Sequence, residues 1–464
     1  MDWLGRQAAM SPERPALLTP EGSLTYAELD EAVAAGVGAL RGAGVETGDR
    51  VAVWGPSAPE TVVALWAVPR AGAVLVPLDT GLTEAQAAGQ VSEAGVRRAL
   101  VSSEAPHLGV EALILHSLSG GKPEPGVESR PDRLHSIVFT SGSSGRRKGV
   151  LLSWGNLEAS AASSAAFWGN GPGDRWLAVL PLSHVGGSSV LWRSFREGGA
   201  VILEPGFEAG RVAEHLASGA ATFASLVPTM LYRLLEMGAG PFPGLRAVLV
   251  GGGPVSEDLL ERAAEAGLPV APTYGMTETA SQVAALRPEE VGRRPRSSGR
   301  ALPGAELRVV GEGRIEVRGP MVSPGYLGGI PRAEGAWLST ADLGTLDEKG
   351  YLTVEGRADD LVITGGEKVR PAEVEAVLGA HPMVTEVAVY GEDDARWGQV
   401  VAAAVVPAGE ADAELLSTFA RARLAPAQVP RRWSFLEELP RTPLGKLDRA
   451  RLRERASPPP EERG

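Results

Sequence analysis

Short apolar runs alternate with longer stretches of helical pattern along the first part of the chain. From Arg50 onward, apolar runs at 51–54, 73–77 and 99–101 are separated by helical patterns at 59–70 and up to Ala94. Runs of this length between helix-length segments are typical of parallel strands that helices cover on both faces. The sequence therefore predicts a βαβαβ unit.

The alternation resumes after the segment 119–133, which is rich in Gly, Pro and charge and which we expect to be an exposed linker. Here Ser256, followed by Glu257 and Asp258, is a typical helix start. A second βα lobe is expected from this part of the chain. Its predicted strands are 136–139, 177–180, 200–203, 222–225 and 247–250, and its predicted helices are 190–195, 227–237 and 256–266.

The pattern changes after Gly299 to alternating strands broken by Gly and Pro, as at 306–310 and 314–318, which predicts a small β-rich unit. Beyond Gly356 the sequence predicts a compact α+β stretch. Its expected strands are 361–363, 387–390 and 400–406, and its expected helices are 371–378 and 413–424.

The predicted fold class is α/β, with a large N-terminal part of two βα lobes plus a small β-rich unit, followed by a small α+β C-terminal domain. We place the large domain at 1–357 and the small one at 358–456. Residues 457–464 carry Pro and charge without apolar anchors, so we expect a disordered tail.

Composition excludes several kinds of function. A net charge of −12 argues against nucleic acid or an anionic membrane as a partner. The chain has no cysteine, which excludes disulfides, thiolate nucleophiles and Cys-ligated metals. Neither a signal-peptide pattern nor a bilayer-length apolar run is found, so the expectation is a cytoplasmic enzyme without membrane insertion.

Lysine is scarce and unevenly placed. The chain has five lysines against forty arginines, and Lys148, Lys368 and Lys446 lie inside motif-like segments. Such placement favours sites that need a compact ammonium, which guanidinium does not replace. Chance survival in an arginine-biased genome is the alternative, and it suffices for Lys368.

The segment 140–149 has the composition of a phosphate-binding loop. It follows an apolar strand and reads Thr-Ser-Gly-Ser-Ser-Gly-Arg-Arg-Lys-Gly. Small residues let backbone N–H groups approach phosphate oxygens, while hydroxyls and an ammonium add donors. Lys148 is followed by Gly149 and an apolar run, unlike the common nucleotide-binding P-loop. A flexible basic surface loop is the alternative. The phosphate-binding candidates are Thr140, Ser141, Gly142, Ser143, Ser144, Gly145 and Lys148.

Together with four later segments, this loop resembles the adenylate-forming superfamily of acyl-CoA synthetases, luciferases and adenylation domains. Those segments are Tyr-Gly-Met-Thr-Glu-Thr at 274–279, Ser-Thr-Ala-Asp-Leu-Gly at 339–344, Gly-Arg-Ala-Asp-Asp-Leu at 356–361 with Gly-Gly-Glu at 365–367, and Pro-Arg-Thr-Pro-Leu-Gly-Lys at 440–446. They occur in the family's order and span nearly the whole chain.

Within the superfamily the chain most resembles the o-succinylbenzoate–CoA ligases of menaquinone synthesis. The similar segments are Leu-Pro-Leu-Ser-His-Val-Gly-Gly at 180–187, Ser-Leu-Val-Pro-Thr-Met-Leu at 225–231 and Gly-Met-Thr-Glu-Thr-Ala-Ser-Gln at 275–282.

The resemblance implies a reaction with ATP, Mg²⁺ and coenzyme A in two halves. A carboxylic acid first attacks the α-phosphate of ATP to give an acyl-adenylate, and the thiol of coenzyme A then displaces AMP. Because two anions meet in the first half, charge neutralisation and positioning should dominate the barrier.

The resemblance also implies roles for single residues at the nucleotide. Glu278 would bind Mg²⁺, and Thr277 would donate to the α-phosphate. Tyr274, Gly252 and Gly253 would lie against adenine, Asp342 would accept the ribose hydroxyls, and Arg357 would reach the nucleotide. The chain has Arg147 where the family usually has proline and Ala341 where it usually has glycine.

For the second part of the chain, the resemblance implies movement. Lys446 would bridge the substrate carboxylate and the α-phosphate during adenylation. The small domain would then rotate about Asp359 and bring Gly365 and Gly366 to the coenzyme A tunnel.

The acyl site is the least defined. The resemblance places His184 near the reacting carboxylate, although a lone histidine is more often structural. Further candidates for the acyl pocket are Thr229, Met276, Ser281 and Gln282.

Two alternatives remain at this point. One is a ligase for another aryl or medium-chain acid, or an enzyme that loads a carrier protein. The other is a nucleotide-binding regulator that has lost catalysis, against which the joint presence of Glu278, Asp342 and Lys446 counts. The sequence leaves the oligomeric state open, a homo-oligomer included.

Overall fold

The computed structural model describes residues 2–140, 147–238, 240–410, 412–442 and 447–456. Backbone contacts divide the chain into two compact units. The first unit contains the described residues up to Leu307 and residues 317–338, while the second contains 308–316 and the chain from Ser339 onward. The domain boundary after Arg357 and the disorder of the C-terminal tail remain predictions. The tail, residues 457–464, lies outside the described residues.

One sheet of the first unit has seven strands in the order β18-β8-β7-β4-β3-β5-β6. Strands β3 to β6 run parallel, as the βαβαβ prediction requires, and β7 joins them parallel to β4. The antiparallel strand β8 follows directly on β7. The strands are β3 (Arg50–Trp54), β4 (Val74–Leu78), β5 (Arg98–Val101), β6 (Glu111–Ile114), β7 (Leu134–Phe139), β8 (Gly149–Ser153) and β18 (Gly325–Tyr326).

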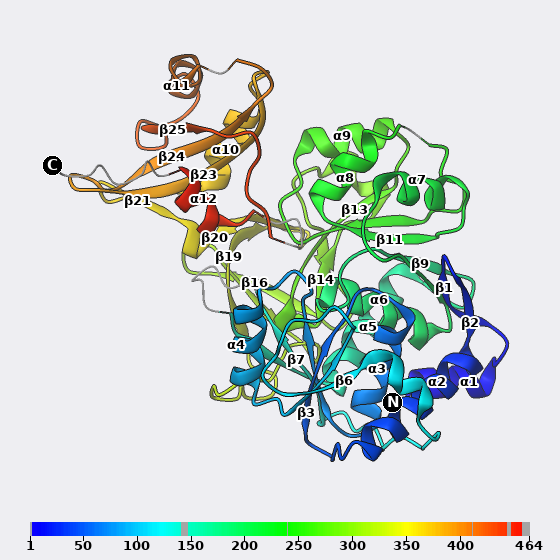
Figure 1. The fold of residues 1–464 in the computed structure, drawn as a ribbon. Coiled ribbons are helices and arrows are strands. Elements are labelled where there is room, and N and C mark those ends of the chain that lie inside the picture. Colours follow the sequence, from blue (N-terminus) through cyan, green and yellow to red (C-terminus); the bar gives the residue numbers. More distant parts are fainter. Residues whose placement is uncertain (1, 141–146, 239, 411, 443–446, 457–464) are drawn as a thin grey trace. The chain divides into compact units, whose positions relative to one another are not determined.

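Helices cover both faces of this sheet. Because side chains alternate along a strand, Val51 and Val53 join one apolar core and Ala52 and Trp54 join another. The first core contains α2 and α3, and the second contains α4 (Figure 1). The helices are α2 (Tyr26–Gly42), α3 (Pro59–Arg70) and α4 (Glu84–Ala94).

The other sheet of the first unit has nine strands in the order β15-β14-β13-β12-β11-β9-β10-β1-β2. Its central strands are parallel, and β13 and β14 form an antiparallel hairpin at one side. The strands are β1 (Pro15–Thr19), β2 (Gly22–Thr25), β9 (Arg175–Ala178), β10 (Ala200–Leu203), β11 (Phe223–Leu226), β12 (Ala247–Val250), β13 (Val270–Met276), β14 (Ser281–Ala285) and β15 (Arg300–Ala301).

Helices α5 and α6 share one core with the inner faces of both sheets, while α7, α8 and α9 cover the outer face of the nine-stranded sheet (Figure 1). The predicted start of α9 is confirmed, because the Ser256 side chain accepts a hydrogen bond from the Leu259 N–H. The helices are α1 (Trp3–Met10), α5 (Trp154–Trp168), α6 (Val185–Glu197), α7 (Ala209–Ala217), α8 (Pro228–Leu235) and α9 (Glu257–Glu265). None of the helices in the described part of the chain is long and apolar enough to cross a membrane.

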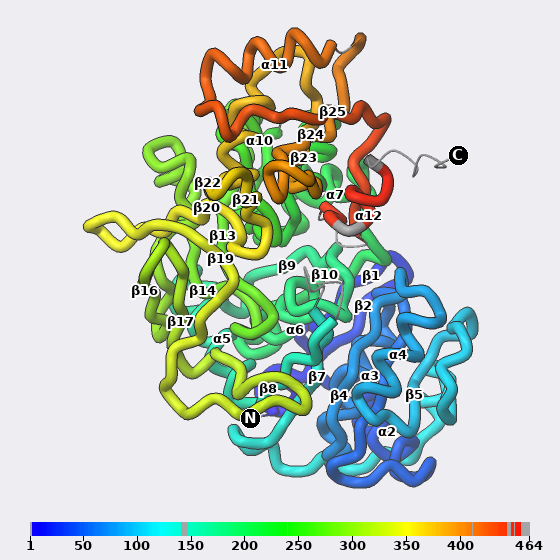
Figure 2. The backbone as a smooth tube through the Cα atoms, turned by 90° about the vertical axis from the view of Figure 1, so that its left-hand side faces the viewer, coloured from blue at the N-terminus to red at the C-terminus, as the bar shows by residue number. Residues whose placement is uncertain are grey.

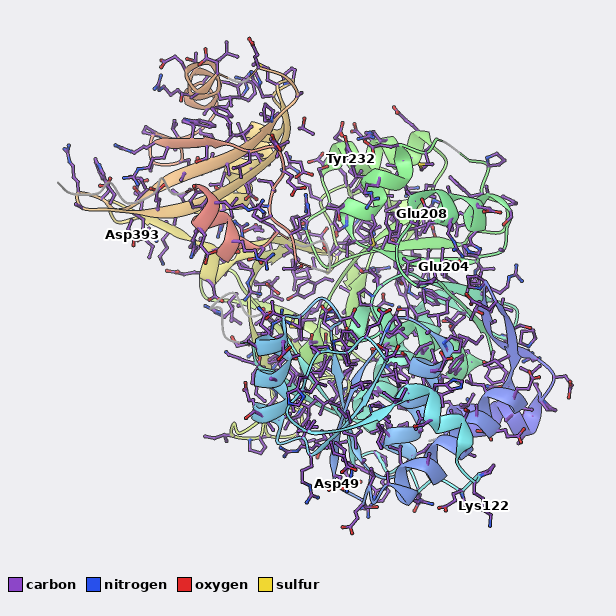
Figure 3. The ribbon with its side chains drawn as sticks, in the orientation of Figure 1. Asp49, Lys122, Glu204, Glu208, Tyr232 and Asp393 are labelled. Carbon is purple, nitrogen blue, oxygen red and sulfur yellow. The ribbon has the colours of Figure 1, made fainter. Side chains whose placement is uncertain are left out.

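The expected linker at 119–133 contains no helix or strand after the short 3-10 turn at Leu115–Gly120. It nevertheless packs on α2, because the Glu124 N–H donates to the Ala34 carbonyl oxygen at 3.0 Å. Lys122 lies in this segment at the outer side of the first unit (Figure 3).

The second unit contains most of a four-stranded sheet with the order β16-β17-β19-β20 and a five-stranded sheet in which β24 pairs with β21, β23 and β25. Figure 2 follows the chain from β19 and β20 in yellow to α12 in red. The elements are β16 (Glu306–Val310), β17 (Arg314–Arg318), β19 (Leu338–Leu346), β20 (Leu352–Arg357), β21 (Val362–Thr364), β22 (Glu367–Val369), α10 (Pro371–Gly379), β23 (Val384–Asp394), β24 (Gly398–Pro407), α11 (Ala413–Arg421), β25 (Arg432–Phe435) and α12 (Arg449–Ala456). The predicted β-rich unit and α+β stretch are confirmed.

Candidate active site

The predicted site residues of the first unit follow the carboxyl ends of its strands. His184 follows β9, Thr229 follows β11, Gly252 follows β12, and Tyr274 lies near the end of β13. In open α/β sheets, ligands bind at this edge. The two sheets thus supply one contiguous set of loops for a ligand.

The predicted phosphate loop connects β7 to the antiparallel strand β8. Its ends are closed by the Thr140 N–H, which donates to the Lys148 carbonyl oxygen at 3.0 Å. Lys148 leads into a strand and not into a helix, so this loop differs from a P-loop, as its sequence predicted. Ser141, Gly142, Ser143, Ser144 and Gly145 lie outside the described residues.

The motif at 274–279 forms a tight hairpin between β13 and β14. A side chain at Gly275 would place its Cβ 2.2 Å from the Ser281 carbonyl oxygen, so only glycine fits. The buried Thr279 hydroxyl accepts a hydrogen bond from the Met276 N–H at 3.1 Å and donates to the Ser281 carbonyl at 2.7 Å. Ala280 adopts φ +56, the one left-handed non-glycine residue in the described part of the chain. Such a conformation costs about 1–2 kcal/mol, and here the surrounding hydrogen bonds enforce it.

Glu278 lies in the 3-10 turn of this hairpin, beside Thr277. The Tyr326 hydroxyl donates to Glu278 Oε1 at 2.8 Å, and the Nζ atom of Lys148 lies 5.5 Å from the centre of the Tyr326 ring. The other oxygen, Oε2, accepts no hydrogen bond from the described residues. Those residues also contain no group of three or more His, Cys, Asp or Glu side chains that could hold a metal. A single free carboxylate oxygen fits Mg²⁺, which usually takes one or two carboxylates and completes its shell with phosphates and water.

His184 is fixed by a buried carboxylate that the sequence analysis did not identify. Its Nε2 atom lies 2.8 Å from Oδ2 of Asp79, which follows β4. Asp79 Oδ1 also accepts a hydrogen bond from the Gly81 N–H at 2.8 Å. Burial acts to raise the pKa of Asp79, but these hydrogen bonds and the charge of Arg147 outweigh it and lower the pKa. Asp79 is therefore an anion, and the Nε2 atom of His184 carries the proton.

Ser281 contacts a buried arginine that the sequence analysis also did not identify. Arg193 lies on α6, and its Nη2 atom donates to Ser281 Oγ at 2.5 Å. The guanidinium lies over the Trp176 ring at 5.1 Å and forms no ion pair with any described carboxylate. Burial lowers the pKa of Arg193 to about 9. An uncompensated buried cation is costly, so this position is suited to an anionic ligand.

The other candidates of the first unit lie in the hairpin, on β14, at the start of α8 and in the turn after β12. Met276 is half-buried in the hairpin, and Gln282 is buried with its Nε2 atom donating to Ser164 Oγ at 3.1 Å. Gly252 has φ +81 in the turn after β12, and the neighbouring Gly253 packs on Pro228, which precedes Thr229. Because β12 pairs with β13, this glycine turn starts beside the residue before Tyr274: a Cβ at Gly251 would lie 2.6 Å from Thr273 Oγ1.

In the second unit, Asp342 and Arg357 face each other across the β19–β20 pair. Arg357 Nη1 lies 3.4 Å from Asp342 Oδ1, and its Nη2 lies 3.1 Å from Asp359 Oδ2. Burial opposes the charge of Arg357, but these carboxylates and Asp360 outweigh it and raise the pKa. The guanidinium of Arg357 therefore joins Asp342, the predicted ribose ligand, to Asp359, the predicted hinge residue.

Gly365 and Gly366 form the two-residue turn between β21 and β22, with φ values of +58 and +89. Gly365 also touches Trp397, since a Cβ there would lie 2.8 Å from the indole ring. The guanidinium groups of Arg431 and Arg396 lie 4.5 and 5.2 Å from the centre of that ring. The turn thus adjoins an aromatic surface with two cations, which the sequence analysis missed.

Lys446 lies outside the described residues. Arg441 and Leu447 form an antiparallel bridge, and the Asp448 N–H donates to the Pro440 carbonyl oxygen at 2.8 Å. Lys368 forms an exposed ion pair with Glu312 at 2.5 Å. The presence of a lysine at this position therefore needs no catalytic explanation.

Two family models match the chain. The model described as AMP-binding enzyme matches residues 4–327, and the model described as AMP-binding enzyme C-terminal domain matches residues 373–446. The chain belongs to the AMP-binding enzyme family. This membership confirms the resemblance to adenylate-forming enzymes that rested on the five ordered motifs.

Among individual relatives, this chain is 38% identical to the 2-succinylbenzoate–CoA ligase of Bacillus cereus (strain AH820) over 98% of both chains. It is 34% identical to the enzyme of that name from Listeria monocytogenes, over 98% of this chain and 99% of the relative. Among solved structures it resembles the o-succinylbenzoate CoA synthetase of Bacillus subtilis in complex with its acyl-adenylate intermediate. The two share a TM-score of 0.91 and 34% identity over 99% of this chain and 98% of the other. The same Bacillus subtilis enzyme in complex with ATP and magnesium ion gives a TM-score of 0.90 at 34% identity, over 98% of this chain and 99% of the other.

Proposed function

We propose that this chain is an ATP-dependent 2-succinylbenzoate–CoA ligase of menaquinone biosynthesis that works in the cytoplasm. It would convert the acid and ATP to an acyl-adenylate and pyrophosphate, and then transfer the acyl group to coenzyme A with release of AMP. Support comes from the relatives of that name, which match over nearly their full length.

The observation that carries the substrate class is the buried Arg193. 2-Succinylbenzoate has two carboxylates, of which one is activated and the other is left unchanged. The unchanged carboxylate would need a cation inside the pocket, and Arg193 is buried without a carboxylate partner among the described residues. Its contact with Ser281 places it beside the motif that would bind the nucleotide. Simple aryl or medium-chain acids have no second anion for this guanidinium.

In adenylation, the phosphate loop with Lys148 would hold the β- and γ-phosphates, and Thr277 would donate to the α-phosphate. Glu278 would hold Mg²⁺, which supplies positive charge at the phosphate oxygens. Lys446 would approach the reacting carboxylate and the α-phosphate. These groups neutralise the charge that two anions bring together, the largest obstacle in this half-reaction.

The nucleotide would lie between the glycine turn with Gly252 and Gly253 and the ring of Tyr274, with its ribose on Asp342. Arg357 would reach the same nucleotide. His184, fixed by Asp79, would line the acyl site together with the half-buried Thr229 and Met276 and the buried Ser281 and Gln282.

For the second half-reaction, residues 358–456 would rotate about Asp359. The Gly365–Gly366 turn would then line the path of coenzyme A. Trp397 with Arg431 and Arg396 offers a ring and two cations beside that turn, as a nucleotide carrying phosphates requires.

ATP–pyrophosphate exchange with two acids tests the substrate. We expect exchange with 2-succinylbenzoate and about a hundredfold lower kcat/KM with 4-oxo-4-phenylbutanoate, which lacks the ring carboxylate, because a buried charge pair is worth several kcal/mol. Arg193→Met should abolish most of this preference. Arg287→Met is the matched control, since Arg287 also stacks on an aromatic ring, Phe167, but is exposed. A loss of stability alone lowers both rates together and leaves their ratio unchanged.

The remaining outcomes decide between the alternatives. Exchange with another aryl or medium-chain acid but not with 2-succinylbenzoate would refute the substrate assignment. Acyl transfer to a carrier protein in place of coenzyme A would indicate a carrier-loading enzyme. Nucleotide binding without exchange for any acid would indicate a regulator.

A further inference from the structure

Residues 323–327 join the phosphate loop to the hairpin that carries Glu278. The Ser323 N–H donates to the Glu278 carbonyl oxygen at 2.7 Å, and the Ser323 hydroxyl donates to the Leu151 carbonyl on β8, also at 2.7 Å. At the other end, the Leu327 N–H donates to the Gly149 carbonyl at 2.8 Å. This short connection is therefore fixed by its backbone to both motifs.

Tyr326 extends from the middle of this connection, where it pairs with Val150. Its hydroxyl donates to Glu278 Oε1 at 2.8 Å, and its ring carries the Lys148 ammonium at 5.5 Å. One side chain on a fixed backbone thus touches the carboxylate and the ammonium that meet the same triphosphate in the proposed reaction. The sequence motifs do not include it.

The hydrogen bond has a direct consequence for the carboxylate. Oε1 accepts the hydrogen bond of the phenol, which restrains the Glu278 side chain, while Oε2 accepts no hydrogen bond from the described residues. A cation–ring contact similarly keeps the flexible lysine side chain at the exit of the loop. Groups whose orientation is fixed before the ligand arrives bind it with a smaller loss of entropy.

We propose that Tyr326 is a positioning residue for MgATP. Its hydroxyl orients Glu278 toward the metal ion, and its ring orients Lys148 toward the phosphates. This inference rests on the adenylating function proposed above. The alternative is a packing role only, since the Tyr326 ring also lies against the apolar core of the first unit.

Calorimetric titration of the full-length protein with ATP, with and without Mg²⁺, separates these roles. Tyr326→Phe keeps the ring and removes the hydroxyl. We expect its affinity for ATP without Mg²⁺ to stay within about twofold of the wild type, while the gain in affinity that Mg²⁺ brings falls about tenfold, as expected for one lost hydrogen bond to a charged group. Tyr326→Leu also removes the ring and should lower the affinity for metal-free ATP about threefold.

Two controls complete the experiment. Tyr232→Phe makes the same chemical change on α8, where the ring stacks on Arg262 at 4.8 Å and lies outside the motifs (Figure 3), and it should change neither affinity. In a Glu278→Gln background, Tyr326→Phe should cause no further loss, because the hydroxyl acts through that carboxylate.

An unchanged Mg²⁺ gain in Tyr326→Phe would overturn the proposal, as would a further loss in the Glu278→Gln background. The titration needs no acid substrate, so its result does not depend on whether 2-succinylbenzoate is the acid. Failure of exchange with every acid would instead refute the proposed function and leave this titration interpretable.

Discussion

The motif regions of the two units are held by different interactions. In the first unit, the hairpin at 274–281 is fixed by main-chain hydrogen bonds around the buried Thr279 and by the close approach at Gly275. In the second unit, the region after β20 is held by charged side chains. Arg357 joins Asp342 to Asp359, and Arg449 of α12 contacts Asp360 at 3.1 Å and Glu375 at 3.4 Å.

The difference concerns how easily each region can rearrange. In the hairpin, rearrangement would leave the polar groups around the buried Thr279 unpaired, which is costly. Partly exposed ion pairs contribute little to stability, and their members can exchange partners with water or with other charges. A two-stage reaction with a rotating domain would need this difference. The hairpin of the first unit would stay fixed, while the ion pairs within the second unit could exchange partners.

The largest effect should follow Lys446→Ala. Adenylation should fall about a thousandfold, because the ammonium proposed to act at the reacting phosphate would be lost, while coenzyme A transfer from supplied acyl-adenylate should survive. Exchange and transfer are measured separately. Lys349→Ala, in an exposed turn of the same unit, is the matched lysine control. Equal loss of both half-reactions would contradict the idea that the second unit serves them in different positions.

A pair of glycine substitutions compares the two regions directly. Gly275→Ala should destabilise the protein by about 3 kcal/mol and reduce exchange, because the new Cβ meets backbone on the opposite strand. Gly366→Ala meets no atom within 4 Å and should cost only about 1 kcal/mol for its left-handed φ of +89. Urea unfolding measures both. Similar losses at the two positions would show that the hairpin is no more rigid than the turn in the second unit.

The sequence predicted elements well where one period dominated. The strand 200–203 and the helix 59–70 coincide with β10 and α3, while the strand predicted at 177–180 begins two residues earlier, at Arg175. The sequence did not predict β1 and β2, because β1 becomes a strand only by pairing with the distant β10 and β2 pairs with β1. Strand propensity of this kind depends on tertiary neighbours. Helices such as α2, α5 and α7 were also not predicted.

The same limit applies to the site. Motif residues such as Glu278 could be named from their order along the chain. Asp79, Arg193 and Tyr326 could not, because each matters through a partner 48 or more residues away in the chain. The one sequence signal for Arg193 was a charged residue within the largely apolar stretch 190–195, which was predicted to be a helix.

Asp79→Asn tests whether the charge of the Asp79 carboxylate holds His184 in place, as main-chain hydrogen bonds hold the hairpin. At pH 7 the substitution should cost about 2 kcal/mol, since it removes a charged acceptor from two hydrogen bonds. The pKa of Asp79 is lowered in the folded state, so its stabilisation is present above the unfolded value of 3.8 and is lost as the pH falls through the folded pKa. The difference between wild type and variant should therefore shrink below about pH 4, as urea unfolding at several pH values would show. A difference that stays constant with pH would mean that the carboxylate charge is not what anchors His184.

The smallest effect is expected for Lys368→Ala, which bears on the exchangeable pairs of the second unit. Lys368 contacts Glu312 through side chains that are 52% and 81% exposed, so solvent already screens the pair. We expect the melting temperature to stay within experimental error of the wild type. The rates of both half-reactions should change by less than about twofold. Glu312→Gln removes the same pair from the other side and should behave alike. A selective loss of coenzyme A transfer in Lys368→Ala that is absent in Glu312→Gln would show instead that this lysine serves the second half-reaction itself. The second unit would then contain a fixed catalytic group in addition to its exchangeable ion pairs.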